Sequence, residues 1–104
     1  MTTITLFRAD NAKNARKILK DGLLPINLTG VAPDSYDATD PKKVYLSKTL
    51  RDAKFYTMIH KKWIVLKVVL TSRDYKELNG NYIGGYQYTF DYIPKEKISI
   101  HVKN

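Results

Sequence analysis

The residues best suited to chemistry lie in the segment 43–67, where the pattern predicts a strand, a turn, a helix and a second strand. The strand formers Val44–Leu46 come first, and Ser47 and Thr49 are suited to cap the following helix. Where a strand meets a helix N-terminus, backbone N–H groups point outward and favour polar or anionic ligands. We therefore expect Tyr45 and Ser47 to form the floor of a site.

The elements that position this floor follow directly. The helix is predicted by apolar residues at every third position, namely Leu50, Ala53, Tyr56 and Ile59. The next segment, Trp63–Leu70, is almost continuously apolar, which is typical of a strand buried on both faces.

A second candidate site is the basic surface around that helix, formed by Lys48, Arg51, Lys54, Lys61 and Lys62. Cations beside aromatic rings such as Tyr56 and Trp63 favour single-stranded nucleic acid, whereas the plainer interpretation is a solvated helix face. Several of the eight tyrosines lie between Tyr75 and Tyr92. Because tyrosine is enriched at interfaces, a protein-binding surface is also expected there.

Composition limits the classes of function. The length of 104 residues predicts one domain over 1–104. The absence of cysteine excludes a disulfide scaffold, a zinc–thiolate site and a thiol nucleophile. The net charge of +8 permits association with nucleic acid or an acidic protein. His60 and His101 have no metal-ligand spacing, so no metal site is expected.

Localisation is inferred from two further patterns. The N-terminus lacks the basic start and long apolar run of a signal peptide, and the longest apolar stretch is too short to span a bilayer. We expect a cytoplasmic protein that does not insert into membranes.

The remaining segments predict two helices and about five strands in all. We expect a strand over Thr2–Ala9, a helix capped by Asp10 or Asn11 that runs to Asp21, and Gly22 just past its end. A loop over 26–41, a turn-rich segment over 71–85, an alternating strand over 86–92 and a last strand over 98–102 complete the chain. This order predicts an α+β domain with helices packed on a small sheet.

The order of these elements, with four local motifs, resembles the ADP-ribosyltransferase fold. The first motif is the strand end Leu6-Phe7-Arg8-Ala9, and the second is the segment 15–25, a helix followed by Gly22-Leu23-Leu24-Pro25. The third is the strand Val44-Tyr45-Leu46-Ser47 followed by a helix with Ala53 and Tyr56. The fourth is the segment 88–98, a strand, a turn at Ile93-Pro94 and a second strand. The resemblance implies a small ADP-ribosyltransferase-like sheet with two helices.

The resemblance also implies a site for NAD, used as a substrate. Arg8 matches the first-strand residue that holds the ribose and phosphate side, a role suited to a planar guanidinium. Tyr45 matches the tyrosine that stacks on nicotinamide, Ser47 is the alternative occupant of that role, and Tyr56 would pack on the other side of the ring.

The third family residue is a glutamate that contacts the ribose and stabilises the cationic centre as nicotinamide leaves. This sequence has Gln87 at the matching position, and a glutamine can hydrogen-bond the ribose but carries no charge. Asp91, on the same face, is a possible substitute. Gln87 therefore argues for reduced or lost activity, and whether the chain is an enzyme stays open.

Two functions follow as expectations. The first is an NAD-dependent mono-ADP-ribosyltransferase that modifies a macromolecular target, as a phage-type or toxin-type effector, with Gln87 and Tyr45 as catalytic residues. The alternative is a non-catalytic binding or inhibitor protein, a pseudoenzyme of the same fold. It would act through its basic, tyrosine-rich surface on an acidic protein or nucleic acid.

Overall fold

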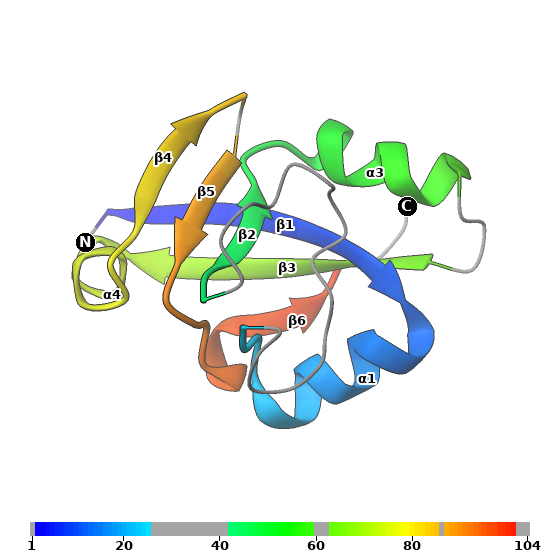
Figure 1. Ribbon diagram of the computed structural model, residues 1–104, viewed down its shortest axis with the longest axis horizontal. Coiled ribbons are helices and arrows are strands. Elements are labelled where there is room, and N and C mark those ends of the chain that lie inside the picture. The colour runs from blue at the N-terminus through cyan, green and yellow to red at the C-terminus, as the bar shows by residue number, and fades with distance from the viewer. Residues whose placement is uncertain (1, 26–41, 60–62, 86, 102–104) are drawn as a thin grey trace.

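The computed structural model describes residues 2–25, 42–59, 63–85 and 87–101, with only the backbone described for 55–59 (Figure 1). The strands are β1 (Thr3–Asn11), β2 (Val44–Ser47), β3 (Trp63–Thr71), β4 (Asn81–Gly84), β5 (Gln87–Phe90) and β6 (Ile98–Ile100). The helices are α1 (Ala12–Asp21), α3 (Leu50–Ile59) and α4 (Ser72–Glu77), with a 3-10 turn η1 (Lys95–Lys97).

The described strands form one antiparallel sheet in the order β4-β5-β2-β1-β3-β6. The long central pair runs without a break from Thr3 opposite Thr71 to Asn11 opposite Trp63. Because paired residues share a face and successive residues alternate between faces, this register assigns each strand residue to one side of the sheet.

The first side, which we call the α1 face, carries the hydrophobic core. Leu6 pairs with Val68 on this face, and both are almost fully buried together with Ile18 of α1. The opposite side, which we call the α3 face, includes Phe7 and its cross-strand partner Ser47. Figure 1 shows α1 and α3 on opposite sides of β1 and β3. The two helices therefore cover the two faces of the same central strands.

The small α+β domain expected from the sequence is confirmed, but the described residues form six strands and three α-helices rather than about five strands and two helices. Several local signals also hold. Asn11 caps α1 by accepting a hydrogen bond from the Asn14 backbone N–H. Gly22 follows the helix with φ of 90°. Thr49 accepts a hydrogen bond from the Asp52 N–H at the start of α3, while Ser47 lies within β2. The predicted loop over 26–41 lies outside the described residues.

The turn-rich expectation over 71–85 is wrong, because this segment forms α4 and β4. Thr71 and Asp74 make a reciprocal capping box that starts α4. Asn79, at φ of 55°, follows the helix, and Tyr82 then pairs with Tyr88 in β5. The short helix lacks a clear apolar period, so the turn residues dominated the sequence signal.

The expectation that β3 is buried on both faces holds only for part of the strand. Leu66, Val68 and Leu70 are almost fully buried on the α1 face. On the α3 face Val65 is buried, whereas Val69 is 38% exposed and Lys67 is half-buried. The continuous apolar run therefore predicts more burial on the α3 face than α3 provides. None of the helices described here is long and apolar enough to cross a membrane.

Candidate functional site

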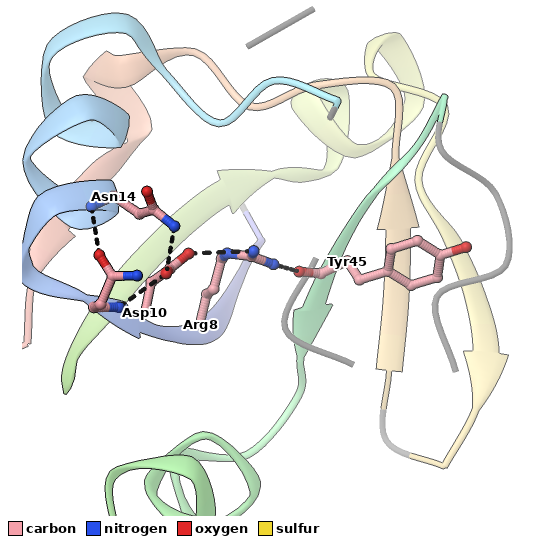
Figure 2. A network of polar contacts seen from close by, with 5 residues as sticks. Arg8, Asp10, Asn14 and Tyr45 are labelled. Carbon is pink, nitrogen blue, oxygen red and sulfur yellow. Dashed lines mark hydrogen bonds and ion pairs between the residues drawn. The ribbon is translucent and has the colours of Figure 1, made fainter. Parts of the chain in front are cut away.

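Arg8 lies in a buried polar network at the junction of β1, β2 and α1 (Figure 2). Its side chain is 7% exposed and donates to Asp10 Oδ2 at 3.3 Å and to the Tyr45 backbone carbonyl at 3.2 Å. The other Asp10 oxygen accepts from the Asn11 backbone N–H at 2.8 Å and from Asn14 Nδ2 at 3.1 Å. The guanidinium thus connects β1 to β2, and its carboxylate partner connects β1 to the first turn of α1.

The register places Arg8 and the Tyr45 ring on opposite faces of the sheet. Arg8 pairs with Leu66 on the α1 face. Tyr45 lies two residues from Ser47, the partner of Phe7, and so belongs to the α3 face. Figure 2 shows the same arrangement, since the Tyr45 ring points away from the guanidinium, which reaches only the Tyr45 carbonyl. The structure therefore does not bring Arg8 to the side of the sheet that carries the Tyr45 ring.

Three of the other candidate residues do lie together. Ser47 is the direct cross-strand partner of Gln87, and Tyr45 is the partner of Thr89. All four share the α3 face of the adjacent strands β2 and β5. Ser47 and Gln87 are half-buried, whereas Tyr45 is 9% exposed. A hydroxyl and a carboxamide therefore stand side by side next to a covered tyrosine ring.

Gln87 is neutral, and the described strand residues around it carry no carboxylate that would supply the charge expected from the sequence resemblance. Among the described strand residues on the α3 face, none is Asp or Glu. Asp91 lies beyond the end of β5, where it forms an ion pair with Lys43 and accepts from Asn79. These two hydrogen bonds, the first with Lys43, lower the pKa of Asp91. Tyr56 belongs to α3, and its side chain lies outside the described residues.

The proposed basic surface is described only in part. Lys48, Arg51 and Lys54 are exposed, while Lys61 and Lys62 lie outside the described residues. Of the two histidines, His60 lies outside them too, and His101 packs edge-on against Phe7 with ring centroids 5.8 Å apart. No group of three or more His, Cys, Asp or Glu residues that could hold a metal ion occurs in the part of the chain that the structure describes.

A pocket lies at the β4 side of the molecule, in the tyrosine-rich region where the sequence predicts a protein-binding surface rather than a pocket. It has a volume of about 490 Å³, and its lining residues are Thr2, Thr3, Ile4, Lys48, Ser72, Tyr75, Tyr82 and Tyr88. The sequence feature that points to this pocket is the number of tyrosines between Tyr75 and Tyr92. Their gathering depends on α4 and β4, which the sequence did not predict.

A scan against protein-family models gives no match, and a search of curated proteins gives none either.

Proposed function

We propose that the chain is a small ADP-ribosyltransferase-like domain that binds NAD on the α3 face and transfers ADP-ribose poorly. The observation that carries this proposal is the pairing of Ser47 with Gln87 on adjacent strands, with Tyr45 on the same face. The sequence resemblance assigns nicotinamide recognition and ribose contact to these positions.

The chemistry of this residue set suits binding better than transfer. A hydroxyl and a carboxamide offer both donors and acceptors, which matches the carboxamide and ribose hydroxyls of NAD. Transfer also needs a fixed negative charge where the ribose becomes cationic. Gln87 is neutral, and the described strand residues on this face supply no carboxylate.

Arg8 takes no part in this proposal. Its guanidinium lies on the other face and is held by Asp10 and the Tyr45 carbonyl. Recruiting it to a ligand on the α3 face would break a buried ion pair, which is strongly unfavourable.

Calorimetric titration with NAD tests the proposal on the wild type and on Ser47→Ala, Gln87→Ala and Ser99→Ala. Ser99 is the matched control, because it is exposed on the α3 face but lies in β6 at the opposite edge of the sheet. Losing a ligand hydrogen bond at Ser47 or Gln87 should weaken NAD binding about tenfold, and Ser99→Ala should leave it unchanged. No heat with the wild type, or equal affinities for all variants, would contradict the site.

A labelled-NAD transfer assay in cell extract separates binding from activity. We expect NAD binding with little label on any macromolecule. Strong labelling that is lost in Gln87→Ala would instead identify an active transferase that works with glutamine.

A further inference from the structure

The pocket lined by Tyr75, Tyr82 and Tyr88, here called the tyrosine pocket, lies on the α1 face. Tyr88 pairs with Leu46 and Ile4 pairs with Leu70, and both partners belong to the hydrophobic core on that face. The tyrosine rings therefore lie across the sheet from Ser47 and Gln87. The pocket volume of about 490 Å³ falls within the range of small-molecule sites.

The three rings are fixed by contacts with one another and with the core. Tyr75 packs edge-on against buried Phe90, with centroids 5.7 Å apart, and against Tyr88 at 6.0 Å. Tyr88 in turn contacts Tyr82 at 4.9 Å in a tilted arrangement. A Cβ at Gly80 would lie 2.6 Å from the Tyr75 ring, so glycine at that position leaves room for the ring. Tyr82 is 47% exposed and presents an aromatic surface to a ligand.

The polar groups around these rings favour an anion. Lys48 is the one cation among the eight described lining residues, and no carboxylate is among them. Thr2, Thr3 and Ser72 add hydroxyls, which can donate to phosphate oxygens. Tyr75 adds a phenolic hydroxyl, which is neutral at pH 7 because tyrosine ordinarily titrates near 10, and burial raises its pKa further. The chain as a whole carries a net charge of +8, which attracts anionic ligands.

From this combination we propose that the tyrosine pocket binds a nucleotide unit, with the base against the exposed tyrosine surface and the phosphate at Lys48. Planar rings and one cation match a base with one phosphate. An acidic peptide would need several cations to pair with its carboxylates, and those carboxylates would not stack on the three aromatic rings. The unit can come from a free nucleotide or from single-stranded nucleic acid, and the two sources share the same chemistry.

The test uses fluorescence anisotropy with labelled oligo-dT, labelled oligo-rU and an abasic oligonucleotide, beside calorimetry with AMP and UMP. Tyr82→Ala removes the exposed ring, and Tyr82→Phe is its matched control because it keeps the ring. Lys48→Gln removes the cation, and Lys95→Gln is the control because Lys95 is an exposed lysine in η1, outside the pocket lining. Circular dichroism verifies folding of each variant.

We expect Tyr82→Ala to weaken binding of the base-bearing probes about tenfold or more, the effect of losing one base–aromatic stack. Tyr82→Phe should bind as the wild type does, and Lys48→Gln should weaken binding more than Lys95→Gln. If only the oligonucleotides bind in this way the source is single-stranded nucleic acid, and if only AMP or UMP does so it is a free nucleotide. Either result supports the pocket.

Three results would overturn the inference. The first is binding of the abasic probe as tight as that of oligo-dT and insensitive to Tyr82→Ala, which would be backbone electrostatics alone. The second is no binding of any nucleotide probe. The third is Tyr82-dependent binding of a labelled poly-glutamate peptide without nucleotide binding. Because NAD titration of Ser47→Ala probes the other face, failure of one site is distinguishable from failure of the other.

Discussion

Arg8 and Asp10, two residues apart on the α1 face of β1, form an ion pair of 3.3 Å with side chains only 7% and 3% exposed. Arg8 extends this pair to the Tyr45 carbonyl in β2, and Asp10 extends it to the first turn of α1. The pair therefore connects β1, β2 and α1. Because both side chains are buried, water does little to stabilise their charges. Structural stability is the property that it controls most directly.

Asp10→Ala is expected to destabilise the fold by about 3–5 kcal/mol, because it leaves the buried Arg8 charge without its carboxylate. Urea unfolding followed by circular dichroism measures the change in the free energy of unfolding. Asp21→Ala, at the exposed end of α1, is the matched control and should change it by less than about 0.5 kcal/mol. A loss below about 1 kcal/mol for Asp10→Ala would show that the pair contributes little.

Arg8→Met distinguishes a structural role for Arg8 from the NAD contact that the sequence resemblance assigns to it. The variant should unfold at lower urea concentration, because the buried Asp10 loses its partner. At a temperature where it remains folded, its NAD dissociation constant should match that of the wild type, since Arg8 lies across the sheet from Ser47 and Gln87. A tenfold weaker affinity in the folded variant would assign Arg8 to the ligand instead.

Gly22 and Gly84 give a matched test of close packing, because their φ angles are 90° and 89°. A Cβ at Gly22 would lie 2.7 Å from the Ile93 carbonyl oxygen, whereas a Cβ at Gly84 would meet nothing within 4 Å. Ile93 also exchanges backbone hydrogen bonds with Leu23, so the carbonyl cannot easily move.

We expect Gly84→Ala to cost about 1–2 kcal/mol, from backbone strain alone. Gly22→Ala should cost at least about 1 kcal/mol more, because the new methyl group also collides with fixed backbone. The two free energies of unfolding, compared under one set of conditions, test this order. Equal costs would mean that the backbone at Leu23 and Ile93 shifts easily enough to accommodate the new methyl group.

The parts of the fold that the sequence predicted are those whose local signals agree with their tertiary environment. The Asn11 cap and Gly22 have the expected roles, and Gln87–Phe90 alternate between the two faces as expected, although β5 ends at Phe90 and not at Tyr92. The prediction for the segment 72–84 was wrong because Asn79-Gly80 and Gly84-Gly85 signal turns. The helix α4 is only six residues long and begins with a single capping box, so it leaves little periodic signal in the sequence. β4 is defined by its pairing with β5, a long-range contact that no local pattern contains.

The candidate site was predictable only to the level of strands. The sequence placed Arg8, Tyr45 and Gln87 on three strands, and these strands are neighbours in the sheet. Which face each side chain occupies depends on register, and a shift of one residue exchanges the faces. The register of Phe7 with Ser47 puts Arg8 opposite to Tyr45 and Gln87, and this relationship cannot be read from the order of the motifs.

Asp74 and Asp91 should make stability fall in acid. The Thr71 backbone N–H is the main cause that lowers the pKa of Asp74, with help from Lys97, and the hydrogen bond from Lys43 lowers that of Asp91. A carboxyl with a lowered pKa in the folded state stabilises the protein above its unfolded pKa, near 3.8 here. This contribution disappears as the pH falls through the folded value.

The double variant Asp74→Asn/Asp91→Asn should therefore lose less stability than the wild type when the pH is lowered from neutral to about 3. Urea midpoints at the two pH values measure the difference. Glu77→Gln/Glu96→Gln, which removes two exposed carboxylates, is the control for general charge repulsion. If both double variants reduce the acid loss equally, the hydrogen bonds of Asp74 and Asp91 are not its cause.

Gln87→Glu should turn NAD binding into NAD consumption. The substitution keeps the length of the side chain and places a carboxylate beside Ser47 on the α3 face, where the described strand residues have none. At the proposed site, a fixed carboxylate would stabilise the cationic ribose centre as its bond to nicotinamide breaks and water or a target nucleophile takes the place of nicotinamide. We expect nicotinamide release, measured by chromatography, to rise about 100-fold over the wild type, comparable to the effect of one preorganised electrostatic group.

Asn81→Asp is the matched control for this gain, because it is also an amide-to-acid change on the α3 face. Asn81 lies in β4, opposite Thr89 and one strand farther from Ser47. Its new carboxylate should leave nicotinamide release at the wild-type rate. Gln87→Glu protein that is folded and binds NAD but releases no more nicotinamide than Asn81→Asp would place the reacting ribose away from residue 87. That result would break the link between Ser47, Gln87 and transferase chemistry, even if NAD still binds.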